Sequence, residues 1–240
     1  MTQEERLDYL VAKFKEDSEQ YKNLQVGEST RDRQIALRSL MNIRMPGLMD
    51  DKTMLIQDEY LSGRIKEKGI VTIGQIQEAA PGLSVWQGDI TLLEVDAIVN
   101  AANSQMLGCF APMHTCIDNC IHTFAGIQLR LECHNRMEEL RSIHGPSYQQ
   151  PTSIPMLTDA YNLPARKVIH VVGPIVSGSL SEEHEKALAD CYTNVLDMCL
   201  ENSLRSVAFC CISTGVFHFP NQRAAEIATA TVRSWLSAHP

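Results

Sequence analysis

Residues 96–103 read DAIVNAAN, and this stretch decides the fold. A short apolar strand, 97–100, runs into two small residues and an amide. Similar apolar or β-branched runs occur elsewhere and alternate with helical stretches. Strands are predicted at 83–87, 97–100, 168–172 and 206–210, and helices at 118–137, 181–202 and 221–237. Strands that alternate with helices predict an α/β sandwich around a mixed or mostly parallel sheet.

The first 70 residues have a different, helical pattern. The first helix has an apolar face with i, i+3, i+4, i+7 spacing, formed by Leu7, Leu10, Val11 and Phe14. A second helix is predicted over 31–44, ended by Pro46, and a weaker third over 53–66. We therefore divide the chain into a helical extension, 1–70, and the sandwich, 71–240. Because every motif follows Gly82, we expect the extension to be an appendage to the ligand site.

The length and charge of the chain exclude some classes of protein. The 240 residues allow one substantial domain with a small appendage. No apolar run approaches the roughly 18 residues that span a bilayer, and the charged N-terminus lacks a signal core, so a cytoplasmic location is expected. A net charge of −8 counts against non-specific nucleic-acid binding. A phosphate ligand is still allowed, since backbone N–H groups at a helix start bind it without lysine.

Polar residues near strand ends are the candidate ligand-binding groups. In α/β sheets, ligands bind in loops beyond the carboxyl ends of strands, which indicates the loops after Asn100 and Cys210. Asn103 offers a donor and an acceptor, which suits a sugar diol, or it satisfies its own turn. Asp89, in the segment QGDI at 87–90, can accept a hydrogen bond from an exocyclic amine. The alternative for Asp89 is an ordinary turn residue at a strand end.

The segment CISTGVFHFP at 211–220 has the composition of a phosphate-binding loop. Small residues and a glycine before a helix form a cradle of backbone N–H groups. Pro220 suits the first turn of the following helix. Phe217 or Phe219 is placed to cover a sugar face. A Ser-Thr-Gly loop taken alone is a weak signal.

The segment GCFAPMHTCIDNCIH at 108–122 contains a candidate metal site. Cys109, His114 and Cys116 are the soft thiolate and imidazole ligands that zinc prefers. Three protein ligands leave one position open for water or substrate, as in catalytic zinc sites. Pro112 makes a loop more favourable than a helix here. Cys120 is a further candidate ligand. The alternative to a metal site is a flexible loop in which Cys and His occur by chance. The other cysteines are expected to be free thiols, mostly in the core.

Taken in order, these segments and YNLPARKVIHVVGP at 161–174 closely resemble the macrodomain family over residues 83–237. The resemblance implies a three-layer α/β/α macrodomain sandwich with a central mixed sheet, preceded by the helical extension. It implies that Asp89 and Ile90 contact adenine and that Asn103 contacts the distal ribose. It also implies that the diphosphate and ribose are wrapped by Ser213, Thr214, Gly215, Val216 and Phe217.

The loop at 108–116 departs from the commoner family pattern. Many macrodomains have a glycine-rich loop followed by Val-Asp-Gly-Ala-Ile-His, whereas this loop is longer and carries the Cys and His residues. It resembles the zinc-containing macrodomain subclass, found in microbes beside a sirtuin-like ADP-ribosyltransferase and a lipoyl-carrier protein. Asp118 aligns with an acidic residue of hydrolytic macrodomains and is either a general base or an N-cap. His122 and His170 are expected to be packing residues.

The resemblance and the metal ligands predict a Zn²⁺-dependent hydrolase. It binds ADP-ribose and removes mono-ADP-ribose from an acidic side chain of a modified protein, with a lipoyl-carrier protein as the implied partner. Asn103 and Asp118 are the predicted catalytic residues. Three alternatives stay open: a non-catalytic reader of ADP-ribose, a deacetylase of O-acetyl-ADP-ribose, and a structural zinc domain with four closed ligands.

Overall fold

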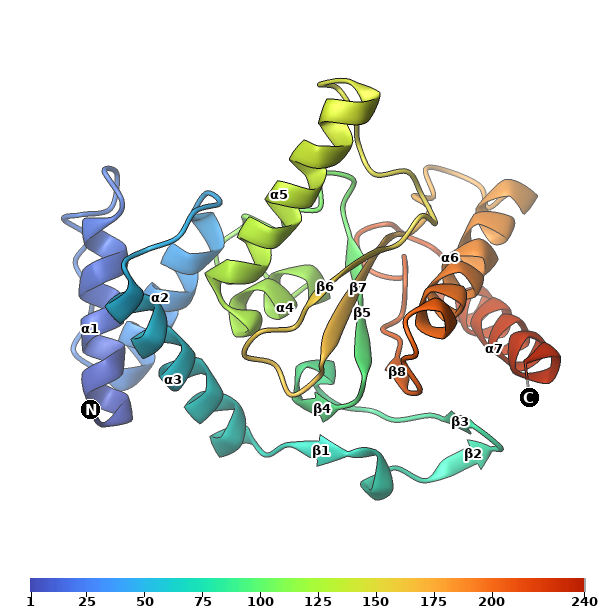
Figure 1. Ribbon diagram of the computed structural model, residues 1–240, viewed down its shortest axis with the longest axis horizontal. Coiled ribbons are helices and arrows are strands. Elements are labelled where there is room, and N and C mark those ends of the chain that lie inside the picture. The colour runs from blue at the N-terminus through green and yellow to red at the C-terminus, as the bar shows by residue number, and fades with distance from the viewer. Residues whose placement is uncertain (240) are drawn as a thin grey trace.

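In the computed structural model, which describes residues 1–239, a four-stranded mixed sheet lies at the centre of the molecule (Figure 1). Its strand order is β6-β7-β5-β8. The strands are β5 (Ala97–Ala102), β6 (Met156–Asp159), β7 (Lys167–Val172) and β8 (Val207–Ala208). Strand β5 is parallel to β7 and β8, and β6 is antiparallel to β7. The predicted mixed sheet is confirmed, and the loops after β5 and β8 leave the same edge of it.

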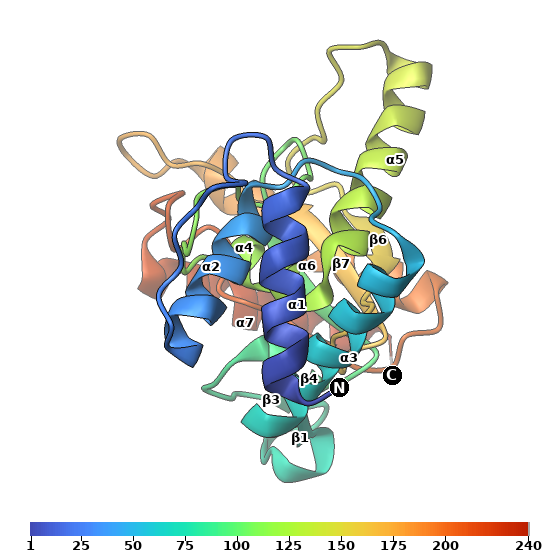
Figure 2. The same cartoon turned by 90° about the vertical axis from the view of Figure 1, so that its left-hand side faces the viewer.

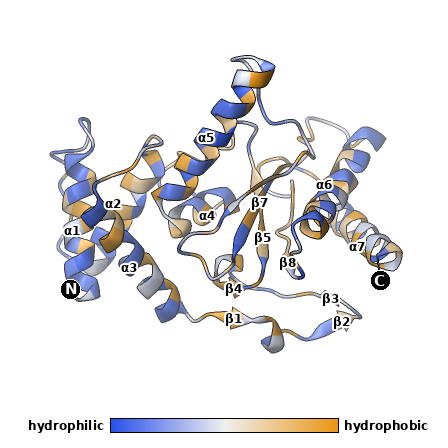
Figure 3. Cartoon of the chain, viewed as in Figure 1, coloured by the Kyte–Doolittle hydropathy of each residue, from blue (hydrophilic) through white to orange (hydrophobic). Residues whose placement is uncertain are grey.

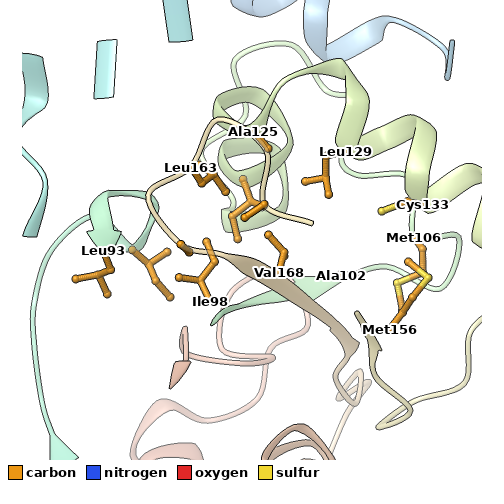
Figure 4. Packing of buried hydrophobic residues seen from close by; sticks show 14 of the residues in the cluster. Leu93, Ile98, Ala102, Met106, Ala125, Leu129, Cys133, Met156, Leu163 and Val168 are labelled. Carbon is orange, nitrogen blue, oxygen red and sulfur yellow. The ribbon is translucent and has the colours of Figure 1, made fainter. Parts of the chain in front are cut away.

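Helices cover both faces of this sheet and complete the three-layer sandwich (Figure 1). They are α4 (Ile117–Ala125) and α5 (Ile127–His144) on one face, and α6 (Glu182–Glu201) and α7 (Asn221–Ala238) on the other. Successive residues of β5 point to opposite faces. Ile98 and Ala102 therefore pack in the cluster under α4 and α5 (Figure 4), while Ala97 and Val99 pack in the cluster under α6 and α7. The predicted α/β/α architecture is confirmed.

The N-terminal extension forms a separate three-helix layer against the α4 and α5 side (Figure 2). Its helices are α1 (Gln3–Glu16), α2 (Thr30–Ile43) and α3 (Asp51–Lys68). Each begins at an N-cap whose side-chain oxygen accepts a backbone N–H, provided by Thr2, Ser29 and Asp50. The apolar faces of the three helices meet in one core cluster, which Ile127 of α5 joins from the sandwich. The predicted helical extension is confirmed.

Some element boundaries differ from the prediction. The helix predicted over 118–137 is two helices, because Gly126 takes a φ of 100°, a conformation that ends α4 and starts α5. The strands predicted at 83–87 and 206–210 are shorter, with β3 at Leu83–Ser84 and β8 as given above. Very short strands β1 (Val71–Thr72), β2 (Glu78–Ala80) and β4 (Leu93–Glu94) join the extension to the sandwich.

Hydropathy follows this arrangement in part, since strand β7 in the middle of the molecule has hydrophobic segments interrupted by hydrophilic ones, as its sequence KVIHVV requires (Figure 3). None of the helices within residues 1–239 has the length and apolarity needed to cross a membrane.

Candidate functional site

The first turn of α4 and the end of β5 bring one carboxylate and two amides together. Asn100 Nδ2 donates to Asp118 Oδ1 at 2.7 Å, and Asn103 Nδ2 donates to Asp118 Oδ2 at 3.2 Å. Asn100 lies on the α4 face of β5, two residues from Ile98, which explains why it reaches the helix. The Asn103 amide also donates to Gly108 O at 3.1 Å, which ties the start of the loop to its middle. The two predicted catalytic residues are thus in direct contact.

Asp118 is buried, and its environment sets its protonation. Burial raises the pKa of its carboxyl to about 6, while the hydrogen bonds from the two amides and the charge of Arg130 oppose this rise. The helix is capped by Cys116 and not by Asp118, so the N-cap alternative for Asp118 is wrong. A pKa near neutrality in a buried carboxylate is typical of residues that transfer protons.

The three predicted metal ligands lie together in the loop before α4, the metal loop (108–116). The donor atoms of Cys109, His114 and Cys116 all lie within 4.8 Å of one another. Cys109 Sγ is 3.6 Å from His114 Nδ1, and Cys116 Sγ accepts from the N–H of Asn119 at 3.4 Å. All three residues are half-buried. Burial, with the neighbouring Cys109, raises the pKa of the Cys116 thiol to about 12 when no cation is present.

These residues fit a zinc ion. Two thiols and an imidazole converge in one loop, which is a donor set that zinc prefers, and a bound cation would favour the ionised thiolates. Cys120 stands apart from the group, because its Sγ lies 3.6 Å from Arg38 Nη2. It belongs to no ligand cluster found within residues 1–239, which supports a three-ligand set over a closed four-ligand set.

A second layer of buried groups lies behind Asp118. His170 Nδ1 is 3.0 Å from Asn100 Nδ2, and its Nε2 is 3.0 Å from Thr158 Oγ1. His122 is 3.6 Å from Asp118, yet burial lowers its pKa well below the usual range, so the pair is not an ion pair. Both histidines are buried, as expected of packing residues. Cys133 joins them, within 4.8 Å of their donor atoms, as a buried thiol in a group separate from the metal loop.

Helix α2 contacts the metal loop directly. Arg38 Nη2 donates to the backbone oxygen of His114 at 2.8 Å and to Asn119 Oδ1 at 2.9 Å. Asn42 Oδ1 accepts from the N–H of Met113 at 3.0 Å. Asn119, which is fully buried, then donates to the backbone oxygens of Cys109 and Ala111. The extension is therefore part of the support of the metal loop, which corrects the expectation that it is only an appendage.

The loop after β8, the phosphate loop (211–220), is held mainly by its own backbone. Phe219 N donates to Ser213 O at 3.0 Å, and His218 N donates to Gly215 O at 3.1 Å. Ser213 takes a φ of 64°, and its buried hydroxyl has no hydrogen-bond partner, which a phosphate oxygen would provide. A Cβ on Gly173 would come within 2.1 Å of this hydroxyl, so only glycine allows that approach.

Other members of the phosphate loop differ in exposure. Val216 is 63% exposed and Gly215 has open space around its Cα, while Thr214 Oγ1 donates to Cys211 O. Phe217 is half-buried against the cluster under α4 and α5, whereas Phe219 is buried in the opposite cluster. Of the two aromatic candidates for the sugar face, Phe217 is therefore the accessible one.

The predicted adenine-binding pair begins a short 3₁₀ helix, η2 (Ile90–Leu92). Asp89 Oδ1 accepts from the N–H and the hydroxyl of Thr91, and its Oδ2 lies 3.6 Å from Lys68 Nζ. Ile90 is buried in the same cluster as Ile121 of α4. Asp89 thus keeps an exposed carboxylate edge beside the side chains of α4.

Sequence reasoning missed four residues that shape the site. Of the four, Asn100 could have been identified from the sequence, because it is a single amide within an otherwise apolar, buried strand. Arg38, Asn42 and Asn119 carry no local signal, since their partners lie up to 82 residues away in the sequence. Only the docking of α2 on α4 brings these groups to the metal loop.

Comparison with known proteins agrees with this geometry. The Macro domain family matches residues 99–228, and the chain belongs to that family. It is 46% identical over 239 residues to a protein-ADP-ribose hydrolase of Treponema medium, covering 98% of this chain and 89% of the relative. A protein-ADP-ribose hydrolase of Staphylococcus aureus is 40% identical over 233 residues, covering 96% and 85%. The crystal structure of the Trypanosoma brucei macrodomain in complex with ADP-ribose superposes with a TM-score of 0.62 at 29% identity, covering 89% and 86%.

Proposed function

We propose that the protein is a zinc-dependent protein mono-ADP-ribosyl hydrolase. It binds ADP-ribose and releases it from a modified, acidic side chain, and the sequence resemblance suggests a lipoyl-carrier protein as the modified protein. One observation carries the proposal: three converging zinc-type donors lie directly before the helix turn that holds Asp118 against Asn103. The relatives named protein-ADP-ribose hydrolase support the same activity.

Cys109, His114 and Cys116 would hold the metal ion. Bound zinc supplies a Lewis acid that polarises an oxygen of the distal ribose or lowers the pKa of water. The loop that carries these ligands is fixed by the hydrogen bond that Arg38 donates to His114 O and by the one that Asn42 accepts from Met113 N–H. Such outer contacts typically set ligand orientation and metal affinity.

Asp118 is the group that moves a proton. With a pKa of about 6 it is mostly ionised at neutral pH, and its oxygens can accept a proton from a water that attacks the anomeric carbon. The hydrogen bonds from Asn100 and Asn103 hold the carboxylate in one orientation. When substrate binds, Asn103 is placed to exchange one of these bonds for a ribose hydroxyl and so orient the sugar.

The remaining segments bind and orient the rest of the ligand. The phosphate loop offers backbone N–H groups and the unpartnered hydroxyl of Ser213 to the diphosphate. This mode of binding suits a protein with a net charge of −8, because it needs no lysine or arginine. The exposed carboxylate of Asp89 accepts a hydrogen bond from the adenine amine, and Phe217 covers a ribose face.

The test is release of ADP-ribose from a protein that is mono-ADP-ribosylated on a glutamate, measured alongside metal content. We expect release to follow zinc occupancy, and a modified lipoyl-carrier protein to be cleaved faster than an unrelated modified protein. Tight ADP-ribose binding without release would indicate a reader. Faster cleavage of O-acetyl-ADP-ribose than of the modified protein would indicate the deacetylase alternative.

A further inference from the structure

A groove lies between the N-terminal extension and α4, on the side of that helix away from the sheet. It has a cavity volume of about 260 Å³ and is lined by α2, α3, the end of α4 and Met113 of the metal loop. We call it the helical groove. Nothing in the proposed function uses this groove.

The charge of the helical groove is opposite to that of the protein as a whole. Four cationic side chains line it and no acidic one does: Arg31, Arg38, Arg64 and Lys68. Two of the four face no carboxylate: Arg31 forms no salt bridge among residues 1–239, and Arg38 donates only to a carbonyl, an amide and a thiol. Arg64 is paired with Glu67 at 2.5 Å, and Lys68 lies 3.6 Å from Asp89. In a chain with a net charge of −8, this is a local positive strip.

The floor of the groove is apolar and partly exposed. Ile35 is 38% exposed and Met113 is 36% exposed. Lys68 Nζ lies 3.9 Å from the centroid of the Phe124 ring, and Arg38 lies on the same ring at 5.9 Å. Apolar side chains with a cationic rim match a ligand that has both apolar and acidic groups.

The position of the groove connects it to the site. Met113 belongs to the metal loop, and Arg38, which also lines the groove, donates to the backbone oxygen of His114, so one end of the groove adjoins the metal loop. At the other end Lys68 faces Asp89, near the adenine position. A protein that carries ADP-ribose on one side chain must leave the pocket past the metal loop, and the groove is the neighbouring surface.

We infer that the helical groove binds an acidic, partly apolar segment of the ADP-ribosylated protein, beside its modified residue. This inference rests on the proposed function. A segment of polypeptide explains the arrangement better than a small anion, since the four cations come from two helices and are separated by apolar side chains. The acidic surface elsewhere on the protein would repel such a partner, so the groove also selects its orientation.

The experiment compares two peptides of equal length, each mono-ADP-ribosylated on one central glutamate. One has aspartate, glutamate and leucine flanks, and the other has lysine flanks. Their affinities for the zinc-loaded protein are measured by stopped-flow fluorescence anisotropy before hydrolysis proceeds, with free ADP-ribose and the unmodified acidic peptide as references. The same measurements are made on the double variant Arg31→Glu/Arg64→Glu. Its matched control is Arg205→Glu/Arg233→Glu, which makes the same change of charge at exposed positions away from the groove.

We expect the acidic peptide to bind about 10-fold more tightly than the lysine peptide at low salt, with the preference shrinking as salt rises. Arg31→Glu/Arg64→Glu should abolish the preference and leave ADP-ribose affinity unchanged, while the control should keep it. Equal affinity for the two peptides, or equal loss in both double variants, would overturn the inference. A failure of the proposed function would instead appear as absent hydrolysis or absent ADP-ribose binding, and the unmodified acidic peptide would still report on the groove.

Discussion

The two loops that bound the site are held in opposite ways. The metal loop is fixed by side chains from other elements, with Arg38 and Asn42 of α2 and Asn119 of α4 bonded to its backbone. The phosphate loop is held mainly by its own backbone hydrogen bonds, such as Phe219 to Ser213, with one further backbone bond from Val176 N–H to Phe217 O. The first loop therefore depends on single distant residues, while the second depends on local chain geometry.

This difference matches the tasks that we propose for the loops. Metal ligands need precise orientation, which tightly held neighbours provide. Phosphate binding needs only backbone N–H groups in the right conformation, which tolerates changes of exposed side chains. Substitutions should therefore impair catalysis most in and around the metal loop, and the predictions below test this from the largest effect to the smallest.

The largest effect is expected from removal of one ligand. Cys116→Ala should abolish tight zinc binding and lower turnover by about 100-fold or more, because two ligands hold the ion poorly. ADP-ribose affinity should fall much less, since Asp89 and the phosphate loop are untouched. The control is Cys211→Ala, an exposed thiol in the phosphate loop, which should retain metal and activity. Zinc content and the rate of ADP-ribose release are measured on each variant. Normal turnover by a folded, zinc-free Cys116→Ala protein would show that the ion only stabilises the loop.

Asp118→Asn keeps the shape of the side chain but removes the base. We expect turnover to fall by about 100-fold, the usual contribution of a general base, while zinc content stays normal. Stability should change little, because relief from burying a carboxylate is opposed by the new amide NH2, which faces one of the two donors, Asn100 or Asn103. Steady-state kinetics and thermal unfolding measure the two effects. Undiminished turnover would show that Asp118 only supports the loop.

Arg38→Ala tests the contribution of α2 to the metal loop. Loss of its hydrogen bonds to His114 and Asn119 should weaken zinc affinity by about 10- to 100-fold, the usual effect of removing a residue that orients metal ligands without binding the metal. Competition with a chelator measures this affinity. Arg31→Ala, about two helix turns away on α2, is the control and should leave it unchanged. If both variants bind zinc like the wild type, the extension does not support the metal loop.

Asp89→Ala tests the adenine end, which lies far from the metal ligands in the sequence. Losing a charge-assisted hydrogen bond should weaken ADP-ribose binding by about 1.5–3 kcal/mol, with zinc content unchanged. Isothermal titration calorimetry gives the affinity directly. An unchanged affinity would show that adenine does not contact Asp89.

The smallest effect concerns the buried layer behind Asp118. Burial lowers the pKa of His170 to about 3, whereas an unfolded histidine titrates near 6.5. Between pH 6.5 and about 3, only the unfolded chain binds a proton at this histidine. The contribution of His170 to the free energy of unfolding is therefore complete above pH 6.5, and below it declines by at most about 1.4 kcal/mol per pH unit. In metal-free protein, the free energy of unfolding should depend less on pH for His170→Gln than for the wild type. Identical pH slopes in urea unfolding would contradict the burial of a neutral His170.

The sequence allowed prediction of the elements whose pattern is local. The strand 97–100 and the helix at 31–44 follow from apolar periodicity, and the metal-loop ligands follow from residue types within eight positions. The break at Gly126 was missed, because apolar residues continue on both sides and only one glycine marks it. Strands of two or three residues, such as β1 and β4, are too short for any periodicity. Asn100 and Arg38 could not be assigned, since their roles arise from tertiary contacts with α4.

The most direct test of the account is metal removal from the unmodified protein. Zinc is removed with a chelator and then titrated back, while release of ADP-ribose from a glutamate-modified protein and affinity for free ADP-ribose are both measured. We predict that turnover rises in proportion to bound zinc up to about one ion per chain, with little change in ADP-ribose affinity. Full turnover by the metal-free protein would contradict it.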